Sequence, residues 1–368
     1  MTSEINTTLA QWSELFMYLA AITYTVAFLA FAWDVAANSR ATLKAENEAE
    51  LEPEKELVGA GAPAKARASV KNINSVRVSS TEQGTGARGM GYKKSAEAKL
   101  AGHVADSSMR WGTSTERRPA ARVAVVVLAI GAVIHLAAVL SRGIAAHRVP
   151  WGNMYEFCTT GALIVTAVYL ITLIFRDVRF VGVLVSGLAV LMMCAATIGF
   201  PTPLGHLKPA LQTYWIWIHV SIAVLASGIF TITFAMAILQ LLQTKREKAI
   251  LSGETPKWNF MRLVPSSQAL ENFSFRLNAV AFVMWTFTII AGAIWAEKAW
   301  GRYWGWDTKE VWSFVIWVVY AAYLHARATR GWSGPRSAWL SIAGYCCILF
   351  NFGVVNVFFQ GLHSYSGL

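Results

Sequence analysis

The chain has 368 residues, of which 55% are hydrophobic, 12% are aromatic and 14% are charged, and its formal net charge is +11. This composition excludes an ordinary soluble domain, because several apolar stretches approach or exceed the roughly 20 residues that a helix needs to cross a bilayer. The positive charge does not indicate nucleic-acid binding, since no basic folded face is visible in the sequence.

Eight apolar segments are predicted to cross the membrane as α-helices, because hydrocarbon offers no hydrogen-bond partner to exposed backbone groups. In chain order they cover approximately residues 15–33, 122–142, 157–175, 180–199, 214–242, 278–296, 310–326 and 337–359. The first segment lacks a basic flank and a small-residue cleavage site, so it is expected to be a retained helix and not a signal peptide. The predicted fold is an all-α polytopic membrane protein.

The distribution of lysine and arginine predicts how the chain is oriented. If the N-terminus lies outside, 26 of the 32 basic residues fall in inner segments, among them 34–122 and 243–277. Cytoplasmic loops carry such an excess of positive charge. Both termini, and the connection that contains residues 295–312, are therefore expected on the extracytoplasmic face of the cell membrane.

Residues 38–121 are the one region whose composition is not membrane-like. They begin with the acidic run Ala45–Glu56 and contain hardly any large apolar residues. Such a sequence cannot bury enough surface to offset its ordering entropy, so we predict a long disordered cytoplasmic loop. Its basic end, Arg110–Arg122, is expected to lie against anionic lipid headgroups. The predicted organisation is a first transmembrane helix in residues 1–37, this insertion, and a compact bundle over 122–368.

Residues 295–312 are the most distinctive part of the sequence. They read WAEKAWGRYWGWDTKEVW and contain five of the 16 tryptophans. A membrane interface normally uses one or two tryptophans per helix end as an aromatic belt. Five tryptophans together with two glycines and Asp307 indicate a flat platform for a large planar apolar ligand, and the histidines nearby point to haem.

Two histidines are predicted on the same outer side as this segment. His219 lies near the outer end of the fifth apolar segment, one turn after Trp215, and His363 lies just beyond the eighth. Neutral imidazole is a usual ligand of haem iron, so the pair could bind one iron from opposite faces. The alternative is that each is a solvated histidine at a helix end.

Two further histidines are predicted at membrane depth. His325 follows Glu310 by fifteen residues, which corresponds to about 22 Å along a helix at ~1.5 Å per residue. His135 lies near the middle of the second apolar segment. Ionisable residues in such positions are functional candidates. For His135 we favour a neutral ring that is hydrogen-bonded to a neighbouring helix.

The charged residues of the tryptophan-rich segment have two interpretations each. Asp307 and Glu310 lie where the seventh apolar segment begins, and carboxylates there stabilise the helix N-terminus. Asp307 could also orient a tryptophan or a ligand histidine. The bases Lys298, Arg302 and Lys309 could pair with haem propionates, because an unpaired buried carboxylate is strongly disfavoured, or they could form an ordinary interfacial cluster.

The segment Trp300–Glu310 resembles the tryptophan-rich "WWD" signature of haem-handling proteins in cytochrome c biogenesis. The order of His219, this signature, His325 and His363 is similar to that of the CcsA/ResC family of system II, and the C-terminal sequence looks closest to its actinobacterial CcsB-type members. The WWD signature alone is shared with the system I proteins CcmC and CcmF. The eight helices and the C-terminal histidine favour system II.

A second motif adds to the resemblance. Residues Pro150–Glu156 resemble a family loop before the third helix, which would place Asn153 and Glu156 on the outer side. The resemblance covers about residues 122–368, whereas residues 38–120 depart from the family pattern and inherit nothing from it.

The resemblance implies haem delivery across the membrane and covalent attachment of haem to the C-x-x-C-H motif of apocytochrome c on the extracytoplasmic side. Haem b would bind in the membrane with His325 as one ligand, and would pass to an outer site between His219 and His363. The residues expected to contact it are His219, His363, His325, Trp300, Trp304, Trp306 and Asp307. Orientation and iron ligation are the protein's contribution, so no nucleophile or acid–base residue is expected.

The resemblance also implies partners. A ResB-like membrane subunit would supply the second membrane ligand and complete a cytochrome c synthase. Apocytochrome c and thiol-reducing proteins would also be needed, since the chain has no C-x-x-C pair of its own. Nucleic acid is not an expected partner.

Three alternatives remain open at this point. The first is a haem exporter or chaperone without synthase activity. The second is a b-type electron carrier in which His135 and His325 face each other inside the bundle. The third is an assembly scaffold that binds no haem.

Overall fold

The computed structural model describes residues 5–59, 100, 103–111, 118–207, 211–329 and 332–363, with the backbone alone for residues 41–59. Within this part of the chain the regular structure is entirely helical, with no β-strand. Eight helical spans of the described residues are long and apolar enough to cross a membrane. The chain is therefore a polytopic membrane protein of the all-α class, as the sequence predicts.

The helices follow one another in chain order with short connections between most of them. They are α1 (Thr7–Gly59), α4 (Pro119–Ala145), α5 (Met154–Phe175), α6 (Gly182–Cys194), α7 (Ser221–Ser252), α8 (Ser267–Trp300), α9 (Thr308–Ala328), α10 (Pro335–Leu349) and α11 (Val355–Phe358). Two 3-10 turns, Arg179–Val181 and Asn259–Leu263, precede α6 and α8.

Several helix boundaries follow from residue types with fixed backbone preferences. Pro119 and Pro335 stand in the first turns of α4 and α10, where a missing N–H costs nothing. Gly253 and Gly301 follow α7 and α8 with φ of 78° and 71°, the left-handed conformation that ends many helices.

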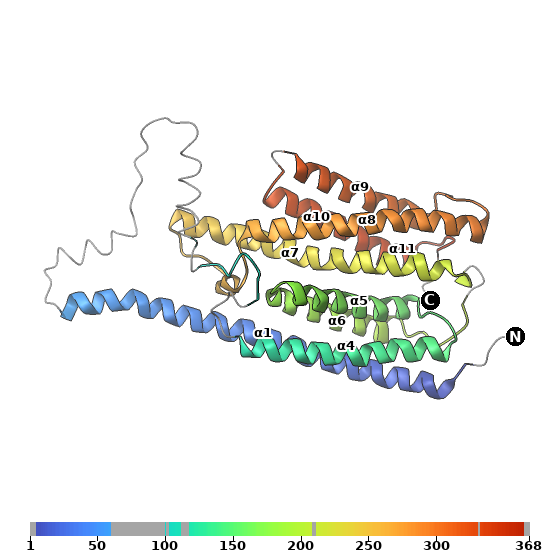
Figure 1. The fold of residues 1–368 in the computed structure, drawn as a ribbon, viewed down its shortest axis with the longest axis horizontal. Coiled ribbons are helices and arrows are strands. Elements are labelled where there is room, and N and C mark those ends of the chain that lie inside the picture. The colour runs from blue at the N-terminus through green and yellow to red at the C-terminus, as the bar shows by residue number, and fades with distance from the viewer. Residues whose placement is uncertain are drawn as a thin grey trace.

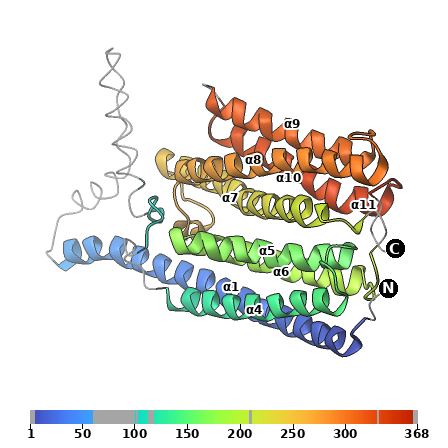
Figure 2. The ribbon, with the colours of Figure 1, turned by 45° about the vertical axis from the view of Figure 1, so that its right-hand side comes forward.

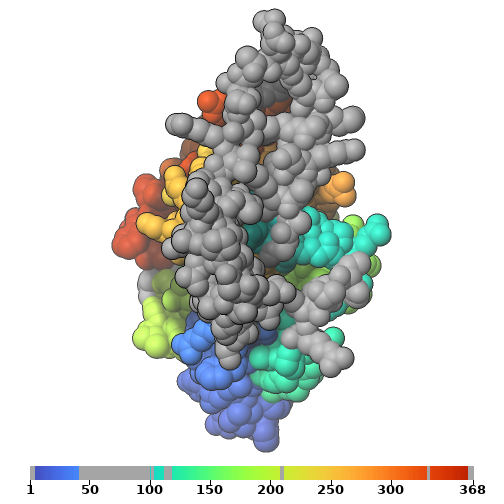
Figure 3. Space-filling model, turned by 90° about the vertical axis from the view of Figure 1, so that its left-hand side faces the viewer, coloured from blue at the N-terminus to red at the C-terminus, as the bar shows by residue number. Residues whose placement is uncertain are grey.

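The helices form a layered bundle whose order in space follows the sequence. α1 packs along α4 at one edge, α5 and α6 lie next to this pair, and α7 and α8 occupy the middle. α9 and α10 close the opposite edge (Figures 1 and 2). The end-on view in Figure 3 shows the N-terminal helix in blue at one side and the C-terminal helices in red at the other.

The two ends of the bundle differ. The start of α1, helix α11 and the connection between α8 and α9 lie at one end, on the right of Figure 1. The connections from α7 to α8 and from α9 to α10 lie at the other end. The tryptophan-rich segment is therefore grouped with the start of the chain and with α11.

Three π-helical segments widen the helices locally. They are Ala195–Gly199 after α6, Ile216–Val220 before α7 and Phe350–Val354 after α10. Such single wide turns occur frequently at functional sites, because they displace side chains and free backbone carbonyls. The second contains His219 and the third contains Asn351.

The region predicted to be a disordered insertion differs from that expectation at both of its ends. α1 continues to Gly59 and not only to residue 37, because residues 38–59 are rich in the good helix formers Ala, Leu, Glu and Lys. Near the other end, Met109 is buried, its carbonyl accepts from the Asp177 N–H at 2.8 Å, and the Trp111 indole donates to the Leu173 carbonyl at 2.6 Å. Residues 60–99, 101–102 and 112–117 of the insertion lie outside the described residues.

Candidate functional site

A cavity of about 290 Å³ opens at the end of the bundle that holds the tryptophan-rich segment. Its walls come from helices α5 to α10 and from the connections around them, and they are mostly apolar and aromatic. Both predicted outer histidines, His219 and His363, line it together with Trp295, Trp300 and Trp304, and we call it the histidine cavity. A concave apolar site with a few convergent polar groups is the usual form of a small-molecule site.

The ring of His219 is held in one orientation by α8. Its Nδ1 lies 2.9 Å from the carbonyl oxygen of Thr288, and a carbonyl can only accept. Nδ1 therefore carries the proton, which leaves the lone pair of the neutral ring on Nε2. The ring also meets Trp295 edge-on, with centroids 5.5 Å apart. In a metal-ligating histidine, the ring nitrogen that does not bind the metal usually donates to such an acceptor.

The ring of His363 is held in an equivalent way by a carboxylate. Its Nδ1 lies 2.6 Å from Oδ2 of Asp307, and Trp300 packs against the ring with centroids 4.8 Å apart. The carboxylate accepts, so Nε2 of the neutral ring again keeps its lone pair. This hydrogen bond is the main reason why the pKa of Asp307 is lowered. Asp307 is also the N-cap of α9 and forms a capping box with Glu310, so the structure contains both of the roles considered for it.

The three tryptophans expected to form a platform are placed differently. Trp300 and Trp304 line the cavity, whereas Trp306 does not and is 73% exposed. The chain turns sharply here, with φ of 57° at Trp306, and the Trp306 ring meets Trp304 edge-on at 5.9 Å. The turn arises because the Glu310 carboxylate accepts the N–H groups of Gly305 and Asp307, at 2.8 and 3.0 Å. Trp306 is consequently at the outer edge of the site.

Of the three basic residues considered as propionate partners, only Lys309 lines the cavity. Its Nζ donates to the Asn351 carbonyl at 2.8 Å and to Oδ1 of Asn356 at 2.9 Å, both on the C-terminal helices. Lys298 is 61% exposed and pairs with Glu297, and Arg302 is exposed. Glu310 lines the cavity too, but its carboxylate is used at the start of α9.

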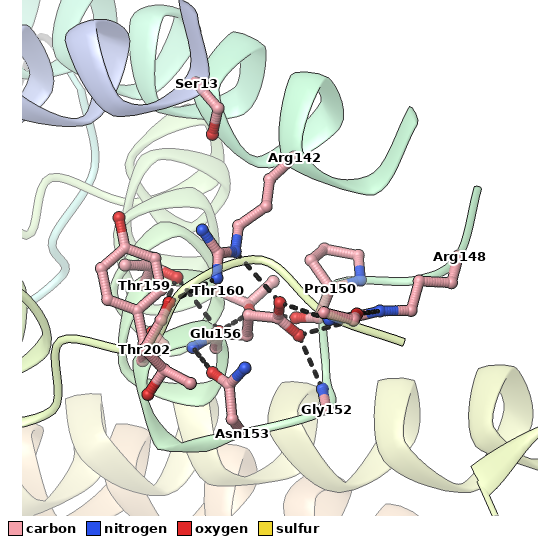
Figure 4. Close-up of polar contacts among 12 residues, drawn as sticks. Ser13, Arg142, Arg148, Pro150, Gly152, Asn153, Glu156, Thr159, Thr160 and Thr202 are labelled. Carbon is pink, nitrogen blue, oxygen red and sulfur yellow. Dashed lines mark hydrogen bonds and ion pairs between the residues drawn. The ribbon is translucent and has the colours of Figure 1, made fainter. Parts of the chain in front are cut away.

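A buried charged cluster fixes the loop that leads into α5 (Figure 4). The carboxylate of Glu156 is fully buried and accepts from Nε of Arg142 at 3.0 Å and from Nη1 of Arg148 at 2.7 Å. It also accepts the Gly152 N–H at 2.7 Å, while the Asn153 side chain accepts the Glu156 N–H at 2.9 Å and so caps the helix. These residues, which we call the Glu156 cluster, thus connect the end of α4 to the start of α5 across the loop between them.

The same cluster reaches a second loop. Arg142 Nη2 donates to the Thr202 carbonyl and Arg148 Nε to the Gly205 carbonyl, each at 2.9 Å. Trp151 lies between the residues of the cluster in sequence and lines the cavity. Glu156 and Asn153 therefore lie at the end of the bundle that holds the tryptophan-rich segment, and they act on the cavity wall without lining it themselves.

The two membrane histidines lie away from this cavity and from each other. His135 is buried on α4, where its Nδ1 lies 3.2 Å from the hydroxyl of Tyr24 on α1, so the expected hydrogen bond to a neighbouring helix is present. His325 is exposed on α9, roughly 25 Å along the helix from Thr308 at ~1.5 Å per residue. α4 and α9 lie at opposite edges of the bundle (Figures 1 and 2), so the pair proposed for an electron carrier does not face one iron.

Some residues of the cavity are not evident from the sequence. Thr288 and Gly292 are one turn apart on α8 and contact the His219 ring. Asn351, in the π-helical segment Phe350–Val354, donates to the hydroxyl of Ser313 on α9 at 3.3 Å. The spacing of Thr288 and Gly292 places them on one helix face. Only the packing of α7 against α8 shows which histidine that face meets.

The fold and cavity define a class: a polytopic helical membrane protein in which two histidines, each with its Nδ1–H engaged, share one aromatic cavity. The sequence model of the family described as Cytochrome C assembly protein matches residues 151–363, which include both histidines and the tryptophan-rich segment.

Similar individual proteins include three that are named Cytochrome c biogenesis protein CcsA. The one from Synechococcus sp. (strain JA-3-3Ab) is 33% identical over 288 residues, which cover 64% of this chain and 83% of the relative. The one from Guillardia theta is 34% identical over 244 residues, with coverage of 62% and 80%. The one from Microcystis aeruginosa is 32% identical over 286 residues, with coverage of 66% and 86%. The chain belongs to this cytochrome c assembly family and to its CcsA group.

Proposed function

We propose that this protein acts in cytochrome c biogenesis, where it carries haem b to the outer face of the cell membrane and holds it for attachment to apocytochrome c. The main support for this proposal is the pair of histidines in one aromatic cavity. Each has its Nδ1–H bound to an acceptor, which leaves the Nε2 lone pair for iron. The relatives named as cytochrome c biogenesis proteins support the same role.

The cavity residues fit haem by chemical type. Nε2 of His219 and Nε2 of His363 would hold the haem iron, because neutral imidazole is a usual ligand of haem iron. Trp300 and Trp304 line the cavity and would offer apolar contact surface to a planar macrocycle. Among the described residues that line the cavity, Lys309 is the one lysine or arginine, and it would pair with a propionate.

The attachment step needs no redox partner of its own. A cysteine S–H of the C-x-x-C-H motif adds across a haem vinyl group, so that the S–H bond and the C=C double bond are replaced by C–S and C–H bonds. The proton of the thiol ends on the vinyl carbon, and no group leaves. The protein would contribute iron ligation and orientation, which place the vinyl edge and the thiols together.

We further propose that a ResB-like subunit covers the exposed side of α9, within the membrane. His325 is exposed on this helix, within a segment long and apolar enough to span the membrane. A polar side chain that faces hydrocarbon is costly, so a partner helix that offers a second iron ligand would remove this cost. His325 would then be one ligand of a membrane haem, and the histidine cavity would lie on the extracytoplasmic side that the lysine and arginine distribution indicates.

Thioether formation is the test that separates a synthase from a haem exporter. The chain would be produced with its ResB-like partner and a reporter apocytochrome in a bacterial host that lacks its own cytochrome c biogenesis system. We expect covalent haem on the reporter, seen by haem staining after denaturation, and none on a reporter whose two motif cysteines are serines. Haem on the membrane complex without any covalent haem on the reporter would instead support the exporter.

A further inference from the structure

A second pocket, of about 320 Å³, lies at the end of the bundle opposite the histidine cavity. It is formed by the segment 103–111, the end of α5 and the start of α8. In contrast to the histidine cavity, its described lining is rich in polar groups. These include Ser107, Ser108, Arg176, Ser266, Asn272 and Arg276.

The pocket carries positive charge that no described residue neutralises. Arg176 donates from Nη1 to the neutral Ser108 carbonyl at 3.0 Å, and Arg276 has no hydrogen-bond or ion-pair partner among the described residues. None of the described lining residues is a carboxylate. Guanidinium, hydroxyl and amide groups all donate hydrogen bonds to anions, and guanidinium matches phosphate oxygens better than an ammonium group does.

Nearby carboxylates are already engaged with other groups. Asp177 pairs with Arg179 at 2.5 Å, and Glu271 pairs with Arg327 at 2.7 Å. The Asp106 carboxylate accepts from the N–H and hydroxyl of Ser108, at 2.9 and 2.7 Å. The anion for this pocket therefore has to come from outside the described part of the chain.

The depth of the pocket indicates what kind of molecule brings the anion. Ile174 and Phe175, directly before Arg176, are 71% and 72% exposed on an apolar span, as expected for side chains in contact with lipid chains. On α8, the exposed Val280 lies one turn after Arg276. Apolar exposed surface thus changes to a basic polar pocket within one helical turn, which is the boundary between acyl chains and headgroups.

We propose that this pocket binds the phosphodiester headgroup of an anionic phospholipid such as phosphatidylglycerol. Basic pockets between transmembrane helices recognise such headgroups. A zwitterionic choline headgroup would bring a third cation next to Arg176 and Arg276, so phosphatidylcholine should bind less well. Because segment 103–111 forms one wall, the lipid would also hold this segment against α5 and α8. The inference is independent of the haem role, which concerns the other end of the molecule.

Native mass spectrometry of the delipidated full-length protein tests the proposal. The protein would be titrated with phosphatidylglycerol, phosphatidylcholine or inorganic phosphate, for the wild type and for the double variant Arg176→Gln, Arg276→Gln. The matched control is Arg336→Gln, an exposed arginine at the start of α10 at the same end of the bundle. Both changes remove exposed or half-buried guanidinium groups and leave no buried charge unpaired, so the variants are expected to fold.

We expect the wild type and the Arg336→Gln control to bind one phosphatidylglycerol at least ten-fold more tightly than phosphatidylcholine. In the double variant this preference should fall to near unity. Equal binding of the two lipids by the wild type, or an unchanged preference in the double variant, would overturn the proposal. Displacement of the lipid by millimolar inorganic phosphate would assign the site to free phosphate instead. The haem absorption of the double variant should match that of the wild type.

Discussion

Gly292 determines where the imidazole of His219 can lie. A Cβ at this position would approach Cε1 of the ring to 2.7 Å and Nδ1 to 3.0 Å, and real side chains do not accept such contacts. The glycine on α8 is thus what allows the ring to reach the Thr288 carbonyl.

Gly292→Ala is therefore expected to displace the His219 ring and to weaken haem binding in the cavity without unfolding α8, since alanine favours a helix by about 1 kcal/mol over glycine. The haem absorption of the purified complex measures the loss. Gly199→Ala is the matched control, because a Cβ there meets nothing within 4 Å. A normal spectrum for Gly292→Ala would show that the ring position is not important for haem.

Asp307 connects the start of α9 to His363. Because its hydrogen bond to Nδ1 fixes the ring, Asp307→Ala should weaken the ligand on this side more than Asp307→Asn, whose amide oxygen can still accept. Haem content should fall in the order wild type, Asp307→Asn, Asp307→Ala. The imidazole concentration that restores the spectrum should rise in the same order. Equal haem content in all three would contradict a positioning role for this carboxylate.

The lowered pKa of Asp307 also predicts a pH dependence. A carboxyl group whose pKa is lowered by folding stabilises the protein above its ordinary pKa, about 3.9, and this stabilisation is lost as the pH falls through the lowered value. The difference in melting temperature between the wild type and Asp307→Ala should therefore be no smaller at pH 5 than at pH 7. A difference that disappears between pH 7 and pH 6 would contradict this.

At the residue scale, the sequence predicts the types of the site residues better than their orientation. His219, His363 and the tryptophan-rich segment could be recognised because their residue types and order are unusual. The outward position of Trp306 could not, since it depends on a positive φ and on the hydrogen bonds of Glu310. Lys298 and Arg302 have the same charge as Lys309, and only the register of the helix ends decides which of them reaches the cavity.

Among the elements, the loop between α4 and α5 depends on the Glu156 cluster. Glu156→Gln would leave Arg142 and Arg148 buried without a counter-charge, and breaking a buried ion pair in this way costs on the order of 3–5 kcal/mol. We expect a clearly lower melting temperature and a loss of haem as Trp151 loses its support. Glu254→Gln, which changes an exposed residue after α7, should do neither. An unchanged melting temperature for Glu156→Gln would show that the cluster does not stabilise this loop.

The eight spans could be predicted because hydrophobic length alone identifies a transmembrane helix. Their ends were less predictable. α1 continues into a polar region that lacks any hydrophobic signal, and segment 103–111 is ordered by a few contacts of Met109 and Trp111 that no periodic pattern announces. The π-helical segments also depend on packing, so the local widening at His219 could not be foreseen.

For the whole molecule, the orientation in the membrane is a prediction from the charge distribution, and it can be measured directly. In a background without the four native cysteines, Tyr303→Cys would mark the tryptophan-rich segment and Ser252→Cys the opposite end, and both positions are exposed. An impermeant maleimide should label Tyr303→Cys in intact cells and Ser252→Cys only after permeabilisation. The reverse pattern would place the histidine cavity on the cytoplasmic side.

The arrangement of the helices separates two histidines that the sequence alone allowed to form an electron-carrier pair. His135 and His325 both lie at membrane depth in the sequence, but α4 packs on α1 and α9 packs on α10, so the two rings lie at opposite edges of the bundle. Hydropathy gives the number of helices and not their neighbours. The grouping of residues from 151 to 363 around one cavity is therefore a result of the three-dimensional structure.

The most direct test of the haem role is the absorption spectrum of the complex purified with its ResB-like partner. Wild type, His219→Ala and His363→Ala would be compared with His206→Ala, an exposed loop histidine outside the cavity. We predict a bis-histidine haem spectrum that is lost or shifted in the two cavity variants, restored by added imidazole, and unchanged in His206→Ala. A haem spectrum that is the same in all four proteins, or no haem in any of them, would contradict haem binding between His219 and His363.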